Sequence, residues 1–340
     1  MGKLVSFGEI MLRLEAPNNL RISQTHSYDA VFGGGEANVA VSAANYGMDA
    51  EFVTRLPKNP IADACVAELR GLSVGVDNIA RGGERMGIYF VEHGASQRAS
   101  VVIYDRAHSS ISEASRSDFD WGRIFDGAAR FHFTGITPAL SDSAAEVTLD
   151  AAKTAHEMGL IVSCDLNYRK KLWSTDKAER VMTALMPYVD ILIANEEDAD
   201  KVFGIRADDT DVNSGVVSGE GYRDVCRKLT DRFGFDAVAV TLRESINASV
   251  NNFSGALYRG GEFYTSKKYT IHIVDRVGGG DSFAGGLIYA LDAGMENQNA
   301  LEFAVAASVL KHSIVGDFNR VTRDEVLALA GGDGSGRVSR

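Results

Sequence analysis

The sequence predicts a doubly wound α/β fold, in which a mostly parallel sheet is flanked by helices on both faces and a small antiparallel β-sheet forms a lid. Two observations predict it. Short apolar, strand-like runs alternate with amphipathic helical stretches over most of the chain, which is the pattern of a parallel sheet covered on both faces. Two stretches break this alternation with strands that have no helix between them, as antiparallel partners do.

The alternating elements can be placed by residue number. Several of the helices end at a glycine, as the helix ending at Met158 does at Gly159, because glycine adopts the left-handed backbone that closes a helix. The strands expected in the main sheet are residues 3–7, 50–55, 130–134, 160–165, 189–194, 237–242 and 269–274, and the helices between them are 61–70, 143–158, 176–186 and 221–233.

The lid is expected from residues 10–32 and 87–106. Its strand-like segments are residues 10–14, 28–32, 87–92 and 100–104. Residues 207–220, acidic and rich in serine and glycine, are expected to form a surface loop, and residues 331–340 a disordered tail. We therefore expect one α/β domain over residues 1–330, with the lid inserted into it.

Composition restricts the class of protein. The chain has 340 residues, of which 45% are apolar and 24% charged, as in an ordinary globular protein. Its formal net charge of −11 provides no overall positive field for nucleic acid or an anionic membrane surface. We expect neither as a partner. Any anionic ligand must be bound by backbone amides and a few arginines.

The cysteines and the amino terminus favour a cytoplasmic protein. Cys65, Cys164 and Cys226 are far apart in sequence and lack metal-ligand spacing, so neither a disulfide framework nor a zinc site is expected. Glu9 and Arg13 fall where a signal peptide would need an apolar region, and no uncharged run approaches the length of a membrane span.

The strongest local motif is Asp275-Arg276-Val277-Gly278-Gly279-Gly280-Asp281-Ser282-Phe283, between a predicted strand and a predicted helix that stops at Gly294. Glycines at such a turn let backbone amides point at one spot, where the helix dipole adds positive potential. An anion is therefore expected there. Asp281 follows in the first helical turn, and the motif alone leaves open whether it caps the helix or acts as a base.

A second glycine motif, Gly33-Gly34-Gly35-Glu36-Ala37-Asn38, opens another helix. Small residues allow close approach of the backbone, while Glu36 and Asn38 offer polar groups for hydroxyls; a tight turn between lid and main sheet remains the alternative. Neither motif has the third glycine of the dinucleotide fingerprint, and no Gly-Lys-Ser/Thr sequence of the Walker type occurs.

Polar residues also follow other predicted strands. Asn195 and Asp198 come directly after strand 189–194, at the edge of the sheet where open α/β proteins bind ligands, and their oxygens suit Mg²⁺ held through water. Arg106 and Arg169 each follow a strand end, and together they could bind a carboxylate, whose geometry matches a guanidinium fork.

The two glycine motifs, in this order and with Asn195-x-x-Asp198 between them, resemble the signatures of the ribokinase-like (PfkB) carbohydrate kinases over about residues 4–315. The resemblance implies ATP and Mg²⁺ as cofactors and Asp281 as the catalytic base, under an anion hole formed by the amides of Gly278, Gly279 and Gly280. The residues that it places at the nucleotide are Asn195, Thr241, Arg243, Gly278 and Gly280, and at the metal Asn195 and Asp198.

Within that family, residues 133–140, 165–173 and 104–106 are similar to kinases that act on 2-keto-3-deoxygluconate. This resemblance implies ATP-dependent phosphorylation of the primary hydroxyl of that sugar acid to the 6-phosphate. The residues that it places at the sugar acid are Gly34, Gly35, Asn38, Tyr89, Tyr104, Arg106 and Arg169. The alternatives are another PfkB-type kinase, such as a fructokinase or ribokinase, and a non-catalytic sensor of sugar acids or nucleotides.

The sequence departs from the family pattern on the nucleotide side. Arg276 stands where many members have threonine, Gly279 where alanine is usual, and Asp198 where glutamate is usual; residues 241–245 replace a segment of the Lys-x-Gly type. These departures leave the nucleotide contacts and the need for a monovalent cation open. An exposed apolar face on the lid would pair with a second copy, so a homodimer through the lid is a further expectation.

Overall fold

The computed structural model describes residues 1–195, 197–207, 219–334 and 336. Within these residues the main sheet has nine strands in the order β14-β13-β12-β11-β10-β9-β1-β4, with β15 paired to β13. The strands are β1 (Lys3–Phe7), β4 (Ala50–Val53), β9 (Ala128–Thr134), β10 (Ile161–Asp165), β11 (Ile191–Asn195), β12 (Ala237–Ser245), β13 (Val250–Arg259), β14 (Glu262–Thr265) and β15 (Tyr269–His272).

The parallel part of this sheet confirms the prediction. The strands β4, β1, β9, β10, β11 and β12 all pair in parallel. Alternate residues of β11 face opposite sides, with Ile191 and Ile193 in one apolar core and Leu192 in the other. Because helices cover both faces, the strands are apolar on both sides, as buried parallel strands are.

The antiparallel extension of the sheet was only partly predicted, because residues 250–265 were not assigned as strands. They form β13 and β14, which pair antiparallel with each other, and β13 also pairs antiparallel with β12. The turn between β13 and β14 contains Gly260 and Gly261, both with positive φ. Two consecutive glycines between strand-like segments are a hairpin signal, so the turn of this hairpin could have been predicted from the sequence.

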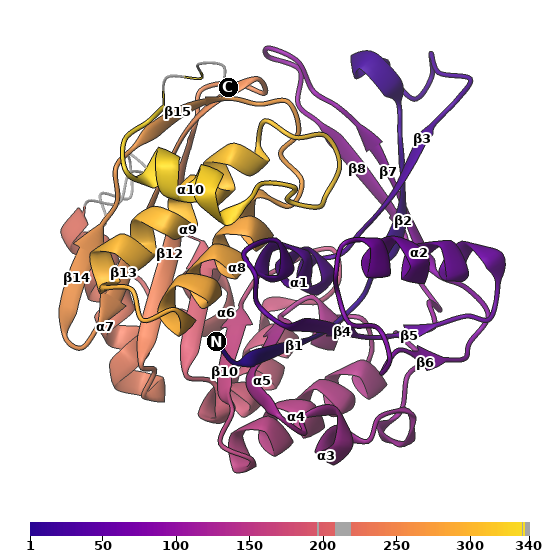
Figure 1. Cartoon of the computed structure of the whole chain (residues 1–340), viewed down its shortest axis with the longest axis horizontal. Helices are drawn as coiled ribbons and strands as arrows, with labels where there is room; N and C mark the ends of the chain where they lie inside the picture. The colour runs from indigo at the N-terminus through magenta and orange to yellow at the C-terminus, as the bar shows by residue number, and fades with distance from the viewer. Residues whose placement is uncertain (196, 208–218, 335, 337–340) are drawn as a thin grey trace.

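The helices lie in two layers. One layer contacts the core on the first face of the sheet and the other contacts the core on the second, and Figure 1 shows α8, α9 and α10 together on the first face. The first layer is α1 (Gly35–Asn45), α2 (Pro60–Gly71), α8 (Gly279–Asp292), α9 (Asn297–Lys311) and α10 (Arg323–Ala330). The second is α3 (Trp121–Ile124), α4 (Asp142–Glu157), α5 (Thr175–Leu185), α6 (Asp198–Phe203) and α7 (Gly219–Phe233).

The predicted lid is a separate four-stranded sheet in the order β3-β2-β7-β8, which extends away from the helical layers in Figure 1. Its pairings β2–β3 and β7–β8 are antiparallel, whereas β2 and β7 pair in parallel because α1, the main-sheet strand β4 and α2 lie between them in the chain. The lid strands are β2 (Met11–Glu15), β3 (Asp29–Gly33), β7 (Gly87–Glu92) and β8 (Val101–Asp105); two short strands, β5 (Arg55–Leu56) and β6 (Ala80–Arg81), pair separately.

The loop and tail predictions fall largely on residues that are not described. Residues 208–218 of the predicted surface loop lie outside the described residues, and α7 begins at Gly219, inside the range expected for the loop. In the predicted tail, residues 335 and 337–340 lie outside the described residues, so its disorder stays a prediction. Among the residues described, no helix is long and apolar enough to cross a membrane.

Candidate active site

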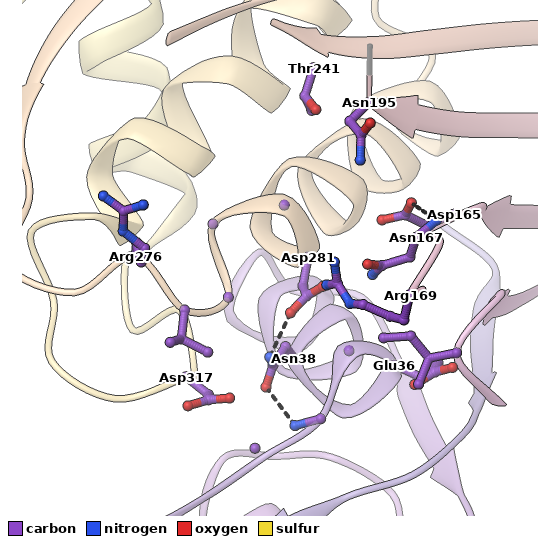
Figure 2. Close-up of a pocket in the computed structure, with 18 of the residues that line it drawn as sticks. Glu36, Asn38, Asp165, Asn167, Arg169, Asn195, Thr241, Arg276, Asp281 and Asp317 are labelled. Carbon is purple, nitrogen blue, oxygen red and sulfur yellow. Dashed lines mark hydrogen bonds between the residues drawn. The ribbon is translucent and has the colours of Figure 1, made fainter. Parts of the chain in front are cut away.

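A cleft of about 510 Å³ opens at the carboxyl ends of the parallel strands, beneath the lid. Asp165 is the last residue of β10 and Asn195 the last of β11, where it lies opposite Thr241 of β12. Figure 2 shows these side chains converging on the start of α8. Every residue that the sequence placed at the site lines this cleft: Gly34, Gly35, Asn38, Tyr89, Tyr104, Arg106, Arg169, Asn195, Asp198, Thr241, Arg243, Gly278, Gly279, Gly280 and Asp281.

The glycine turn before α8 is shaped by two constraints. Gly278, the N-cap of the helix, has φ of 81°, a left-handed conformation that favours glycine. A Cβ atom there would lie 2.1 Å from the backbone oxygen of Asp317. At Gly280 a Cβ would meet nothing within 4 Å, so this position opens toward the cleft. The amides of Gly280 and Asp281 have no backbone acceptor among the described residues, which leaves them available to an anion.

Asp281 is not the cap of α8. The N-cap is Gly278, and no side chain of the described residues caps this helix end. Instead, Asp281 Oδ2 accepts a hydrogen bond of 2.7 Å from Asn38 Nδ2 on α1. Burial raises the pKa of the Asp281 carboxyl to about 6; the Asn38 hydrogen bond opposes this shift, as do the charges of Arg169 and Lys311. A carboxyl with a pKa near neutrality in a cleft suits a general base.

The second glycine motif brings α1 close to strand β1 and the lid. A Cβ on Gly34 would lie 2.0 Å from the backbone oxygen of Glu9, so only glycine fits. Gly34 N donates to Asn38 Oδ1 at 3.3 Å, which orients the amide of Asn38 so that its nitrogen faces Asp281. The motif therefore positions the side chain that holds the candidate base.

Glu36 has a different role from the hydroxyl contact that the sequence suggested. Its buried carboxylate accepts hydrogen bonds from Thr134 N, Thr134 Oγ1 and Thr137 Oγ1 at 2.7–3.1 Å. Burial raises its pKa to about 7. Glu36 thus ties α1 to the end of β9, and this long-range contact is invisible in the local sequence.

The two predicted carboxylate-binding arginines differ in their surroundings. Arg106 Nε donates to Glu9 Oε2 at 2.7 Å, and its guanidinium lies 5.0 Å from the ring centroid of Tyr104. Arg169 is exposed, its guanidinium forms no hydrogen bond or ion pair with any described residue, and its side chain points toward Asp281 in Figure 2. Arg169 is thus the freer of the two to bind an anionic substrate.

The carboxylates of Asp165 and Asp198 line the same cleft as Arg169. Asp198 Oδ2 accepts from Asn195 N at 3.1 Å, and Asp198 Oδ1 from Tyr168 N at 3.2 Å. Burial raises the pKa of Asp198 to about 6, and burial together with the charges of Asp198 and Asp281 raises that of Asp165 well above its usual value. A cation beside these carboxylates would favour their ionised forms, and carboxylate oxygens are donors that fit Mg²⁺.

The side of the cleft next to β12 contains two arginines, Arg243 and Arg276, that no described carboxylate neutralises by a direct bond. Arg276 Nη2 donates to Ala248 O at 3.0 Å, and burial, followed by the charge of Arg243, lowers the pKa of Arg276. Arg243 lies opposite Phe253 in the β12–β13 pair. Two arginines that repel each other in one cleft suit an anion between them. The sequence noted Arg276 only as a departure, so its place in the cleft is new.

Comparison with known proteins identifies the class. The model of the pfkB family of carbohydrate kinases matches residues 1–317. The chain therefore belongs to the PfkB family of carbohydrate kinases and is a sugar kinase with the ribokinase-like fold.

Its relatives narrow the comparison further. A crystal structure of 2-dehydro-3-deoxygluconokinase from Thermotoga maritima has a TM-score of 0.93 at 53% identity and covers 97% of this chain and 98% of that one. A 2-dehydro-3-deoxygalactonokinase of Haloferax volcanii is 37% identical over 335 residues, which are 97% of this chain and 98% of the relative. A 2-dehydro-3-deoxygluconokinase of Thermoproteus tenax is 27% identical over 322 residues, 93% of this chain and 90% of the relative.

Proposed function

We propose that the chain phosphorylates 2-keto-3-deoxygluconate, also called 2-dehydro-3-deoxygluconate, on its primary hydroxyl, with ATP as the phosphoryl donor. The observation that carries the proposal is the pairing of Asp281 with Asn38, next to the amides of Gly280 and Asp281, which have no backbone acceptor among the described residues. The kinase names of the relatives from Thermotoga maritima and Thermoproteus tenax support this sugar acid.

In this proposal Asp281 accepts the proton of the sugar hydroxyl while that oxygen attacks the γ-phosphorus of ATP, the bond from this phosphorus to the bridging oxygen breaks, and ADP leaves. The amides at the start of α8 stabilise the charge on the transferred phosphoryl group, because such a loose transition state needs mainly positioning and charge compensation. The lid tyrosines Tyr89 and Tyr104, whose rings stack at 5.8 Å, cover the sugar. The exposed guanidinium of Arg169, together with the remaining amino group of Arg106, binds its carboxylate.

The nucleotide and metal residues follow from the same geometry. Thr241, Arg243 and Gly280 line the side of the cleft assigned to ATP, next to Asn195. Asn195 and Asp198 would hold Mg²⁺ through water, since the oxygens of Asp198 already accept two backbone hydrogen bonds. When bound, Mg²⁺ neutralises phosphate charge. ADP release measured with and without K⁺ tests whether a monovalent cation is required.

The experiment that tests the function is ADP release with Mg-ATP, with and without K⁺, on 2-keto-3-deoxygluconate, 2-keto-3-deoxygalactonate, gluconate, fructose and ribose. We expect the keto-deoxy acids to be preferred. Arg169→Ala should raise KM for these acids about 10-fold or more, the effect of losing a charged contact of ~1.5–3 kcal/mol, and leave KM for ATP unchanged. The exposed Lys171→Ala is the matched control.

Other substrate preferences in this assay would contradict or change the proposed function. A preference for fructose or ribose would contradict the carboxylate contact and leave a neutral-sugar kinase. A higher kcat/KM for the galactonate-derived acid would favour the activity named for the Haloferax volcanii relative. No turnover on any of the five would refute the proposed substrate and favour a sensor.

The raised pKa of Asp281 predicts the pH dependence of the reaction. A base must be deprotonated, and its pKa is about 6 in the free protein. We therefore expect kcat/KM to be constant above about pH 7 and to fall about tenfold per unit below pH 6, since kcat/KM reports the free enzyme. A profile that stays flat down to pH 4.5 would contradict the raised pKa. Stability to unfolding, followed by circular dichroism over the same range, separates titration from acid unfolding.

We also propose a homodimer through the lid. Strand β8 is an edge strand of the lid sheet, and Val101 and Ile103 on it are 44% and 49% exposed. An edge strand with apolar side chains favours association with another strand. We expect Ile103→Lys to shift the protein from dimer to monomer in light scattering, whereas Ile61→Lys on α2 should not. A wild-type monomer at micromolar concentration would contradict the proposal.

A further inference from the structure

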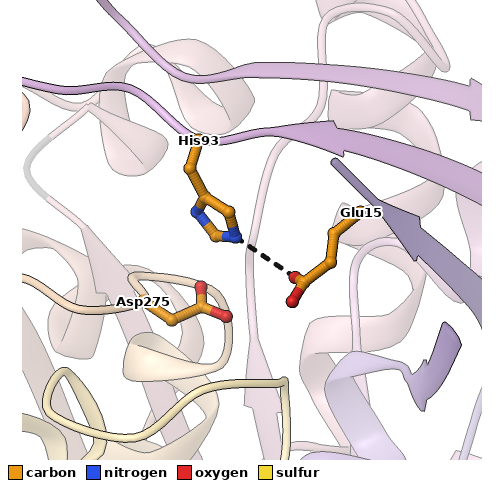
Figure 3. Close-up of side chains that lie close together, drawn as sticks. All are labelled: Glu15, His93 and Asp275. Atoms are coloured by element: carbon orange, nitrogen blue, oxygen red, sulfur yellow. Dashed lines mark hydrogen bonds and ion pairs between the residues drawn. The ribbon is translucent and has the colours of Figure 1, made fainter. Parts of the chain in front are cut away.

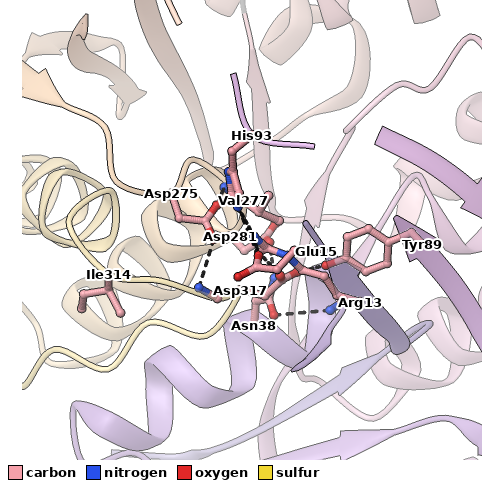
Figure 4. Close-up of polar contacts among 12 residues, drawn as sticks. Arg13, Glu15, Asn38, Tyr89, His93, Asp275, Val277, Asp281, Ile314 and Asp317 are labelled. Atoms are coloured by element: carbon pink, nitrogen blue, oxygen red, sulfur yellow. Dashed lines mark hydrogen bonds and ion pairs between the residues drawn. The ribbon is translucent and has the colours of Figure 1, made fainter. Parts of the chain in front are cut away.

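The largest fully buried polar side chain of the described residues is Arg13, on lid strand β2. Its Nη1 donates to Asp317 Oδ1 at 2.8 Å, and its Nη2 donates to Asp275 Oδ2 at 2.6 Å. The same Nη2 donates to Glu15 and lies 3.0 Å from His93 Nε2. Figure 4 shows this cluster between the lid and the loops that carry Asp275 and Asp317. We call these five residues the anchor cluster.

Part of the anchor cluster has the spacing of a metal site. One ligand atom from each of Glu15, His93 and Asp275 lies within 4.8 Å of the others (Figure 3). However, Arg13 Nη2 contacts all three side chains. The guanidinium of Arg13 therefore already supplies the positive charge between these three side chains, in the place that a metal ion would occupy.

Asp275 connects Arg13 to the glycine turn before α8. Its Oδ1 accepts a hydrogen bond from Val277 N at 3.0 Å, immediately before Gly278, and its Oδ2 accepts one from Gly316 N at 3.0 Å. The carboxylate that Arg13 binds is thus bonded to the backbone of the turn and to the backbone of the loop that follows α9. A shift of Asp275 would move the start of α8.

Asp317 provides the second connection. Its Oδ2 accepts a hydrogen bond from Tyr89 OH at 2.6 Å, while its Oδ1 binds Arg13. Its backbone oxygen is the atom that a Cβ on Gly278 would meet at 2.1 Å. Arg13 therefore binds both Asp275, which precedes the turn, and Asp317, whose backbone packs against Gly278. Through Asp317 it is also linked to Tyr89, a lid tyrosine that lines the cleft.

We propose that Arg13 is a positioning residue, which fixes the start of α8, and with it Asp281, relative to the lid strands that cover the sugar. The inference rests on the proposed role of Asp281 as the base. A planar guanidinium can bind two carboxylates in fixed directions, which an ammonium cannot. Because reacting groups tolerate little misplacement, a loosened turn costs rate even when every group of the site is present.

The test is a double-mutant cycle on kcat with Arg13→Met and Asp281→Asn. We expect Arg13→Met alone to lower kcat about 10- to 100-fold. In the Asp281→Asn background it should lower the residual rate less than about 3-fold, because the group that Arg13 positions is already absent. A role limited to holding the fold would reduce both rates by the same factor, and that result would overturn the proposal.

A conservative variant and a control variant help to interpret the double-mutant cycle. Arg13→Lys retains the charge but cannot bind both aspartates; we expect a smaller loss of kcat with the same dependence on Asp281, and it serves if Arg13→Met does not fold. Arg85→Met removes an arginine just before lid strand β7 that pairs with Asp105 at 2.8 Å outside the cluster, and should leave kcat unchanged. Near-normal turnover by Asp281→Asn alone would refute the proposed base together with this inference. A low rate of Asp281→Asn with equal losses in both backgrounds would refute only the inference.

Discussion

Replacement of Asp281 by asparagine is expected to cut kcat by about 10²- to 10⁴-fold, the usual effect of losing a general base. The amide is nearly isosteric and can still pair with Asn38, whose Nδ2 lies 2.7 Å from Asp281 Oδ2, so the cleft should keep its shape. The amide cannot accept the sugar proton. Kd for ATP, measured by fluorescence with a labelled nucleotide, should change by less than about 3-fold, because the glycine amides proposed to bind phosphate are retained.

Two controls sharpen this prediction. Asp292→Asn, at the far end of α8, removes a carboxylate that pairs with Arg130 at 2.6 Å, away from the cleft, and should leave kcat unchanged. Thermal unfolding of Asp281→Asn should be no less cooperative than that of the wild type, since a buried charge is removed rather than added. Turnover within a few-fold of the wild type would show that another group accepts the proton.

Gly278→Ala is expected to abolish most activity and to destabilise the fold. The residue has φ of 81°, and a non-glycine side chain in such a conformation costs about 1–3 kcal/mol. Its Cβ would in addition lie 2.1 Å from the Asp317 backbone oxygen, so the turn must move. Since loss of one anion-hole donor costs about 10²- to 10³-fold in kcat, a displaced turn should cost at least as much. Steady-state kinetics and urea unfolding measure the two effects.

The same helix offers matched controls. Gly294, just beyond the end of α8, has φ of 72° and no heavy atom within 4 Å of an added Cβ; Gly294→Ala should cost about 1 kcal/mol of stability and leave kcat intact. Gly280→Ala has room for its Cβ but projects it into the cleft, so KM for ATP should rise while the protein folds normally. Equal kinetics for Gly278→Ala and Gly294→Ala would contradict an anion hole at this turn.

Much of the parallel sheet could be predicted because each strand and its following helix form a local pattern. Strands β1, β10 and β11 match expected segments to within two residues at either end. Once a parallel sheet is expected, residues just past its strands must share one edge, which is why Asn195 and Arg169 could be placed in one site. The β13–β14 hairpin was missed although Gly260 and Gly261 mark its turn, because the start of β13 places a polar residue, Asn251, at a buried position where the alternation calls for an apolar one.

The sequence by itself determined the doubly wound sheet and the order of the two glycine motifs, because strand-turn-helix patterns and glycine turns are encoded within a few consecutive residues. The local motif left Asp281 as either a cap or a base, and the resemblance to the carbohydrate kinases made it the candidate base. Only the tertiary structure decided how that base is held. Arg13 and Asp317 are 304 positions apart, and Asn38 and Asp281 are 243 apart. No local periodicity relates such residues, and a buried charged side chain looks like a surface one until the fold shows its partners.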